Sequence, residues 1–292
     1  MYVVAGVTGK VGSAAAAALL ERGKKLRVLV RDEARGRRWA ERGAEVAVGS
    51  LDDWEFLTGA LRGASGALLM VPSPDHIDLK DVCRCQMAMV DALAAGIAAA
   101  RVKNVVFISS IGGQLPDGNG PARSHHYAES RIAESGAVTT FVRAAYFMEN
   151  WLFSLQPVLQ NGLLPSYLDE SRAIPMVSAV DVGETAVDAL LDPPRATRVI
   201  ELSGPREYRP SDVALELGRV LGRPVQLVTV PPSGAAGALA AAGYQPQVAG
   251  LFAELYAGLN SGRIGWQGGA AHALRGQVHL EQVLAAVTRP LA

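Results

Sequence analysis

The sequence has few cysteines, no net charge and no long apolar run, and each of these absences excludes a class of protein. Cys83 and Cys85 are too few for a disulfide framework. They lie two apart in a predicted helix and so point to different faces, which leaves no metal site formed by them alone. Lysine plus arginine and aspartate plus glutamate both total 28, unlike the basic balance of a nucleic-acid-binding protein. No uninterrupted apolar run reaches membrane-spanning length.

These absences favour a soluble, intracellular protein. The low cysteine content is typical of a reducing cytoplasm, which is the expected location. A predicted strand begins at Tyr2 and leaves no room for a signal peptide. With 292 residues, 49% of them hydrophobic, the chain suits one large α/β unit or a dinucleotide-binding domain with a smaller lobe. We expect a soluble protein with a small-molecule substrate and no nucleic-acid or membrane partner, and a homodimer is one option for its assembly.

The first residues predict a strand, a glycine-rich turn and a helix. The apolar run 2–5 leads into the turn 6–12, and an alanine-rich stretch follows from 13 to 20. Glycines at this spacing give a tight turn, room for a pyrophosphate and close packing of the helix on the strand. The free N–H groups of the helix would then face the phosphates. The predicted cofactor contacts of the turn are Gly6, Thr8, Gly9, Lys10, Val11 and Gly12; the alternative is a turn that binds no ligand.

Strands and helices alternate along the first half of the chain. Further strands are predicted at 26–30, 44–48, 67–71, 104–108 and 139–143, and the helices between them at 33–42, 53–62, 77–95 and 121–135. This alternation predicts an α/β fold with a Rossmann-like, doubly wound parallel sheet. We expect residues 1–150 to form the nucleotide-binding domain. Residues 151–292 should form mainly a smaller C-terminal substrate-binding lobe, with core elements returning at about 173–205.

The pattern past residue 144 is less regular. Asp181 is predicted as the N-cap of a helix over 182–191, and 198–202 as a last strand of the core. Residues 160–167 read as irregular. A helix at 211–221 and a strand at 225–230 follow, and the rest is mainly helical.

The ends of the predicted strands mark where a ligand would bind. In an open parallel sheet, ligands lie outside the carboxyl ends of the strands. Those ends form an inferred contact strip for one extended cofactor. Besides the glycine turn and Arg31, which follows the strand at 26–30, the predicted members of this strip are Ser50, Leu51, Val71, Pro72, Ser109 and Phe147.

Arg31 indicates which cofactor is bound. NAD-selective folds usually place an acidic residue about 20 positions past the glycines, on the ribose 2′-hydroxyl. Arg31 holds that position here, with Lys10 as a second cation, and a guanidinium pairs well with a phosphate. NADP(H) is therefore favoured, while the neighbouring Asp32 keeps NAD(H) as the second choice. Alternatively, Arg31 is a solvated charge at a strand end.

The chain resembles the NmrA-like branch of the atypical short-chain dehydrogenases/reductases, which includes NADPH-dependent quinone reductases and redox-sensing regulators. The resemblance implies NADP(H) along the strand ends and a substrate between the sheet edge and the C-terminal lobe. It covers nearly the whole chain in the expected order. The segments that carry it are 4–12, 30–32, 105–110, 134–136, 140–143, 147–150, 180–183 and 202–205.

The sequence departs from the wider superfamily at its catalytic motif. Typical members use Tyr-x-x-x-Lys, whereas this chain has Tyr127 followed by Arg131, which is a poor mimic of a compact ammonium group. The segment is more similar to the lysine-free helix of quinone-reductase-like members, which keep a histidine near His125 and an acid at Glu129. The candidate proton donors are therefore Tyr127, His125 and His126. A histidine at such a position is otherwise a surface or capping residue.

An aromatic cluster follows the predicted sixth strand. Tyr146, Met148 and Trp151, together with the cofactor-facing Phe147, would line a flat apolar pocket suited to an aromatic ring, with ordinary core packing as the alternative. Ser110 is the polar residue that we expect to contact the substrate.

Together these features predict an NADPH-dependent oxidoreductase that transfers a hydride to a quinone-like, enone or polyketide-type aromatic substrate. The alternative is a non-catalytic NADP(H)-binding redox sensor that acts through a protein partner.

Overall fold

The computed structural model describes residues 1–77 and 81–288 and contains one large parallel sheet. Its eight strands lie in the order β13-β10-β6-β5-β4-β1-β2-β3, and every neighbouring pair is parallel. The predicted Rossmann-like doubly wound fold is therefore confirmed. The strands are β1 Tyr2–Val4, β2 Leu26–Val30, β3 Glu45–Val48, β4 Gly66–Leu69, β5 Asn104–Ser110, β6 Val138–Ala144, β10 Arg198–Ser203 and β13 His272–Arg275.

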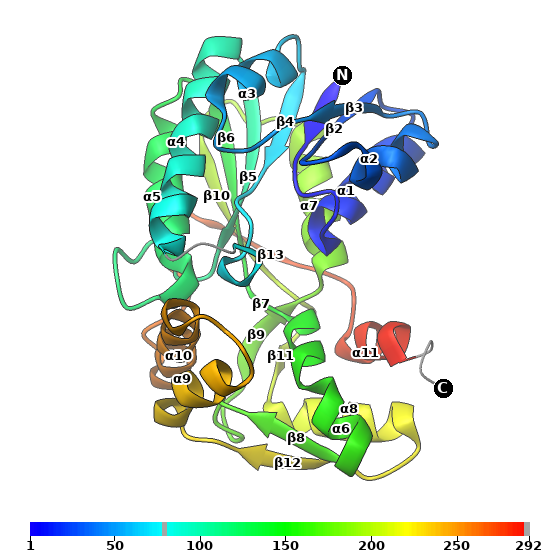
Figure 1. Ribbon diagram of the computed structural model, residues 1–292, viewed down its shortest axis with the longest axis vertical. Helices are drawn as coiled ribbons and strands as arrows, with labels where there is room; N and C mark the ends of the chain where they lie inside the picture. The colour runs from blue at the N-terminus through cyan, green and yellow to red at the C-terminus, as the bar shows by residue number, and fades with distance from the viewer. Residues whose placement is uncertain (78–80, 289–292) are drawn as a thin grey trace.

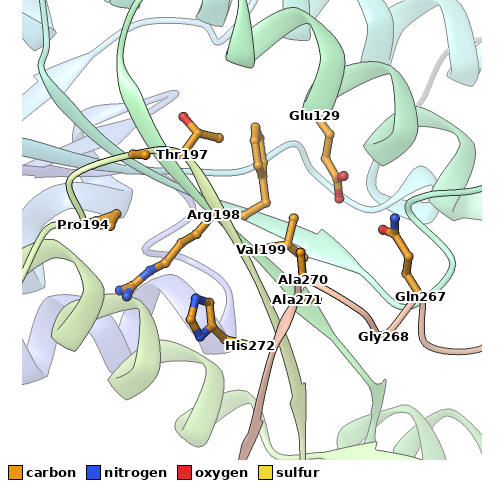
Figure 2. Close-up of a pocket in the computed structure, with 12 residues that line it drawn as sticks. Glu129, Pro194, Thr197, Arg198, Val199, Gln267, Gly268, Ala270, Ala271 and His272 are labelled. Carbon is orange, nitrogen blue, oxygen red and sulfur yellow. The ribbon is translucent and has the colours of Figure 1, made fainter.

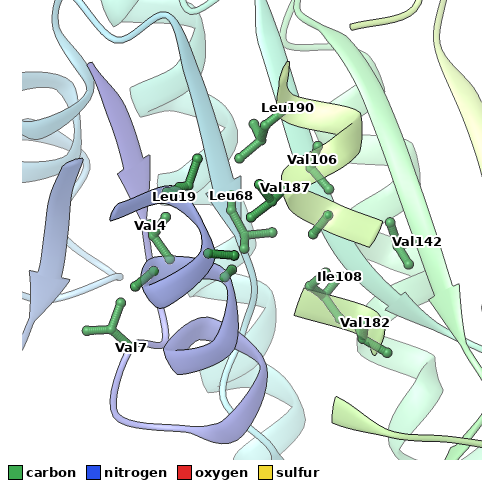
Figure 3. Close-up of a cluster of buried hydrophobic side chains, with 14 of the residues drawn as sticks. Val4, Val7, Leu19, Leu68, Val106, Ile108, Val142, Val182, Val187 and Leu190 are labelled. Atoms are coloured by element: carbon green, nitrogen blue, oxygen red, sulfur yellow. The ribbon is translucent and has the colours of Figure 1, made fainter. Parts of the chain in front are cut away.

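Helices cover both faces of this sheet (Figure 1). On one face, α1 (Lys10–Glu21), α2 (Glu33–Ala40) and α7 (Ala179–Leu191) pack over the sheet residues drawn in Figure 3. On the other face lie α3 (Trp54–Leu61), α4 (Val82–Ala100) and α5 (Arg123–Ala133). Burial of this sheet on both faces explains why its strands are nearly continuous apolar runs.

Local capping sets the start of several helices. Asp53 is the N-cap of α3 and accepts hydrogen bonds from the backbone N–H groups of Glu55 and Phe56, so the helix starts where it was predicted. Ser178, not Asp181, caps α7, so the prediction for Asp181 was wrong. The Asp181 carboxylate instead accepts hydrogen bonds from the backbone N–H groups at 277 and 278, and so holds the segment that follows β13.

The predicted helix at 77–95 starts and ends too early. Asp81 accepts a hydrogen bond from the backbone of Arg84 and caps α4, which continues past Gly96 to Ala100. Gly96 lies inside the helix because its missing side chain lets α3 approach closely: a Cβ there would lie 2.7 Å from the Cβ of Leu57. Residues 78–80 of the predicted helix lie outside the described residues.

The C-terminal lobe is built on two small sheets in the lower half of Figure 1. One contains β7 (Tyr146–Phe147), β9 (Ile174–Val177) and β11 (Glu207–Tyr208). The other pairs β8 (Leu163–Ser166) with β12 (Gln226–Thr229), so the prediction of irregular chain at 160–167 was wrong. The lobe's helices are α6 (Leu155–Asn161), α8 (Pro210–Leu221), α9 (Pro232–Ala241), α10 (Pro246–Ser261) and α11 (Leu280–Thr288). The described residues also form three 3₁₀ segments along the chain: η1 (Pro74–His76), η2 (Gly120–Ala122) and η3 (Met148–Ser154).

The sequence analysis predicted β10 as the last strand of the main sheet, and this prediction was wrong. After α10 the chain returns and adds β13 beside β10, with Ile200 opposite His272 in the register. The last strand of the sheet is thus supplied by the C-terminal part of the chain.

Helix α4 is long and apolar enough to pass a length-and-composition test for a membrane span. It nevertheless carries Arg84, Gln86 and Asp91, and it packs between α3 and α5. Buried core helices of soluble proteins commonly meet the same length and composition criteria, so α4 is only weak evidence for a membrane span.

Candidate nucleotide-binding and active site

The glycine turn between β1 and α1 has the shape of a phosphate cradle. Gly6 has a φ of +70°, a conformation that favours glycine. A Cβ on Gly12 would lie 2.4 Å from the backbone carbonyl of Gly6, so only glycine permits this close packing. Gly9 lies at the N-cap of α1 and is exposed, and a Cβ there would only reach ordinary contact, 3.4 Å from the Gly6 oxygen. The turn therefore leaves bare backbone for a pyrophosphate.

The electrostatics of the turn suit an anion. α1 has 12 residues, no side-chain cap and no acidic residue in its first turn, so the positive end of its dipole is not neutralised. Lys10 is exposed in the same turn. Arg38 of α2 donates hydrogen bonds to the Val7 carbonyl and the Ser13 hydroxyl, and so ties α2 to the turn.

The order of the strands brings the predicted cofactor residues to the carboxyl-terminal end of the sheet. β3, β2, β1, β4, β5 and β6 are parallel neighbours, so their carboxyl ends lie side by side. The segment after β4 is fixed by Gln86, a residue that the sequence did not single out. This buried side chain donates a hydrogen bond of 2.9 Å to the Pro72 carbonyl. Contacts of Ser50, Leu51, Val71, Pro72, Ser109 and Phe147 with a cofactor stay predictions.

The two residues that bear on cofactor choice occupy different environments. Arg31 is exposed directly after β2, and within the described residues its side chain makes no hydrogen bond or ion pair. Asp32, in contrast, caps α2 through the Arg35 N–H and forms an ion pair of 2.7 Å with the Arg35 guanidinium. Because the Asp32 carboxylate is occupied, the arrangement favours recognition of a 2′-phosphate by Arg31 over recognition of a ribose hydroxyl by Asp32.

Arg31→Glu is expected to weaken NADPH binding about 100-fold and to leave NADH binding nearly unchanged. The substitution replaces a phosphate-binding cation by an anion, and only NADPH carries the extra phosphate. Titration of both nucleotides against the wild-type and variant proteins measures the two dissociation constants. Arg37→Glu, on the same exposed surface, is the matched control. Equal losses for the two nucleotides would contradict the assignment of Arg31.

The predicted proton donors are not brought together at the strand ends. The Tyr127 hydroxyl donates a hydrogen bond of 2.8 Å to Asp91 of α4, which raises the pKa of Tyr127. The same carboxylate binds Arg131, so the whole Tyr-x-x-x-Arg motif is directed to the surface of α4. Because the phenol is bound to Asp91, the geometry does not favour Tyr127 as a proton donor.

The two histidines also have backbone partners. Nδ1 of His126 lies 3.0 Å from the Gly113 carbonyl, and Nδ1 of His125 lies 3.4 Å from the Pro121 carbonyl. Burial lowers the pKa of His125, so this imidazole is neutral at pH 7. A neutral ring that donates through Nδ1 presents Nε2 as an acceptor, which makes His125 a poor acid.

Ser109 is anchored by a buried ion pair beneath the strand ends. Its hydroxyl donates to Oε1 of Glu129 at 2.6 Å, and Arg143 binds both oxygens of that carboxylate at 2.9 and 2.6 Å. Because its proton is engaged by Glu129, the Ser109 hydroxyl can only accept a hydrogen bond from a bound group.

A second carboxylate extends this network towards the edge of the sheet. Glu201 of β10 accepts hydrogen bonds from the backbone N–H groups of Gln267 and Gly268 and lies 3.9 Å from Arg143. A groove of about 570 Å³ opens beside it, between α5, β10 and the 267–272 segment (Figure 2). Within the described part of the chain, the lining of this groove includes none of the predicted cofactor residues, so it is separate from the strand-end strip.

Glu149, which follows the aromatic cluster, was not predicted as a site residue. Its Oε1 accepts a hydrogen bond of 3.0 Å from the Ala179 N–H at the start of α7, while its buried Oε2 has no partner within the described residues. Burial raises the pKa of Glu149, and the neighbouring Lys10 opposes this effect. Glu149 therefore connects the lobe to the start of α7.

The side chains of the aromatic cluster differ in how deeply they are buried. Met148 is fully buried and Trp151 is 4% exposed, and both belong to the apolar core of the lobe. This matches the packing alternative for these two side chains. Phe147 and Ser110 keep partial exposure at the strand ends, whereas Tyr146 is buried.

The glycine cradle, the parallel strand ends and the lobe above them define a dinucleotide-binding protein of the Rossmann class. Comparison with known proteins specifies the family. Residues 2–255 match the NmrA-like family, and the chain belongs to it. The resemblance inferred from the sequence motifs is thus confirmed.

Three relatives cover most of the chain. The chain is 30% identical over 261 residues to an NAD(P)H azoreductase of Xenophilus azovorans, which covers 88% of this chain and 86% of the relative. It is 32% identical over 257 residues to a (4-alkanoyl-5-oxo-2,5-dihydrofuran-3-yl)methyl phosphate reductase of Streptomyces griseus, covering 87% and 85%. The structure of an NADPH-dependent quinone oxidoreductase from Escherichia coli in complex with NADPH superimposes with a TM-score of 0.81 at 22% identity, covering 98% and 99%.

Proposed function

We propose that this protein is an NADPH-dependent reductase of conjugated acceptors such as quinones, enones and related aromatic compounds. The observation that carries the proposal is the pairing of an open α1 N-terminus with an exposed Arg31 one strand away. The family membership and the reductase relatives support the same activity. NAD(H) is the less favoured cofactor because Asp32 is already bound to Arg35.

The residues of the glycine turn would hold the pyrophosphate, and Arg31 would hold the 2′-phosphate. When bound, NADPH supplies a hydride for the reduction. Ser109, fixed by Glu129, offers an oxygen that can accept a hydrogen bond from an amide N–H above the strand ends. The aromatic Phe147 presents a partly exposed ring at the same edge.

The relatives and the weak acids of the site support the proposed class of substrate. The three relatives are named for azo compounds, an unsaturated furanone phosphate and quinones. Each of these acceptors has a conjugated system that spreads the charge gained with a hydride. Such acceptors need less help from a strong acid than a simple ketone does. This fits a site in which Tyr127 and His125 are poorly placed as acids.

The purified protein is expected to oxidise NADPH in the presence of simple quinones, followed at the nicotinamide absorbance band. The Gly9→Asp variant is the control, because its carboxylate would occupy and repel the pyrophosphate position. An acceptor panel of quinones, an azo dye and an unsaturated lactone would define the substrate class. Absence of turnover above this control, with NADPH binding retained in the wild type, would contradict the reductase and indicate the redox-sensing alternative.

A further inference from the structure

One arginine of α2, Arg38, is fixed directly on the glycine turn. Its Nη2 donates one hydrogen bond to the carbonyl of Val7 within the turn and another, of 3.3 Å, to the hydroxyl of Ser13 in the first turn of α1. α2 follows β2 along the chain and lies beside α1 (Figure 1). The guanidinium of Arg38 therefore lies where α2 meets the turn that is proposed to hold the pyrophosphate.

Packing holds this guanidinium in a defined position. Its central carbon, Cζ, lies 4.8 Å from the centroid of the Trp39 ring, and Trp39 is itself buried. Gly36 lets α2 lie close to the sheet, since a Cβ there would lie 2.4 Å from Cγ1 of Val46 in β3. Because both the helix and the side chain are already fixed, Arg38 loses little conformational freedom when it binds a ligand.

The guanidinium of Arg38 keeps donors for a ligand. Val7 and Ser13 engage only the N–H groups of Nη2, which leaves those of Nη1 and Nε. Arg38 is exposed, and within residues 1–77 and 81–288 it forms no ion pair, unlike Arg35 of the same helix, which binds Asp32 at 2.7 Å. An exposed cation with unused N–H groups beside a phosphate cradle is suited to bind a further phosphate.

The fold brings Arg38 and Arg31 to the same part of a bound dinucleotide. In dinucleotide-binding folds the residue after the second strand contacts the ribose 2′-oxygen, while the turn after the first strand holds the pyrophosphate. Arg31 directly follows β2, and β2 is the parallel neighbour of β1. Arg31 therefore approaches the 2′ position from the strand end, and Arg38 approaches it from the side of α1 and α2.

We propose that Arg38 is a second ligand of the NADPH 2′-phosphate and that it sets the preference for NADPH over NADH together with Arg31. This inference rests on the proposed use of NADPH. The oxygens of a phosphate group can accept hydrogen bonds from two guanidinium groups that approach from different sides. NADH has a hydroxyl group in place of this phosphate, so its binding gains little from the charge of Arg38.

The test measures dissociation constants in the full-length protein and needs no turnover. Arg38→Met keeps the length of the side chain without its charge, and should weaken NADPH and adenosine 2′,5′-bisphosphate about 30-fold. Binding of NADH and of adenosine 5′-phosphate should change by no more than about twofold. Arg37→Met is the matched control: Arg37 is the adjacent exposed arginine, and within the described residues it makes no contact with the turn. It should leave the binding of all four ligands nearly unchanged.

A second variant separates recognition of the phosphate from support of the turn. Arg38→Gln can still donate a hydrogen bond to the Val7 carbonyl but carries no charge, so it should show the same selective loss as Arg38→Met. Equal weakening of all four ligands by both variants, or no weakening of any, would overturn this inference while the reductase stands. Selective loss of the two 2′-phosphorylated ligands in a protein that oxidises no NADPH would support Arg38 and overturn only the proposed reduction.

Discussion

Gly12→Ala is expected to destabilise the protein by about 3 kcal/mol and to abolish NADPH binding. The new methyl group would lie 2.4 Å from both the carbon and the oxygen of the Gly6 carbonyl and 2.7 Å from the Ala5 oxygen. These are backbone atoms of β1 and the turn, so the clash cannot be relieved by rotating a side chain. α1 must move away from the sheet, and its N-terminus then no longer faces the pyrophosphate.

Two further glycine variants separate stability from binding. Gly9→Asp should keep the free energy of unfolding within about 0.5 kcal/mol, because a Cβ at this exposed position meets only ordinary contact. Its carboxylate should still weaken NADPH binding at least 100-fold by repelling the phosphates. Gly59→Ala in α3, with nothing within 4 Å of the added atom, should be neutral or slightly stabilising. Urea unfolding and NADPH titration measure both effects. Tight NADPH binding by Gly12→Ala would refute the cradle.

Arg143→Met is expected to destabilise the protein by about 3–5 kcal/mol. The side chain of Arg143 is 5% exposed and lies between Glu129, 13% exposed, and Glu201, 5% exposed. Methionine has a similar length but no charge, so the variant would leave two buried carboxylates without their shared cation. The loss should appear as a lower urea midpoint with an unchanged slope.

Two controls test the cause of this loss. Arg263→Met removes a surface pair with Asp117, whose side chains are 56% and 69% exposed, and should change stability by no more than about 0.5 kcal/mol. Adding Glu129→Gln to Arg143→Met should recover part of the loss, because one of the two unpaired charges is then removed. A stable Arg143→Met protein would show that the carboxylates find another way to be neutralised.

The first half of the fold could be predicted from the sequence because its signals are local. The strand at 26–30 has the predicted bounds, and Asp53 caps α3 through backbone groups two and three residues away. β8 and β13 were missed because their pairing is not local. β8 is a four-residue strand that contains Pro165, and it is stabilised by β12 more than 60 residues later. β13 is fully exposed and has no apolar pattern, so only its register with β10 defines it.

In the site, too, local features could be predicted and features that depend on distant contacts could not. The glycine turn could be predicted because spacing and position in the chain specify its geometry. The direction of Tyr127 could not, because it depends on how α5 is rotated against Asp91 of α4. Asp181 looked like a cap because it precedes an apolar helix, but its carboxylate binds backbone almost 100 residues further along.

The position of β13 has a consequence for synthesis on the ribosome. β10 has β6 on one side from the moment both strands have emerged, but its other side stays unpaired until residues 272–275 leave the exit tunnel. During this interval the nascent protein exposes an open strand edge, which other chains can join. A nascent chain that stalls within α10 should therefore be a preferred client of chaperones that cover exposed β-edges.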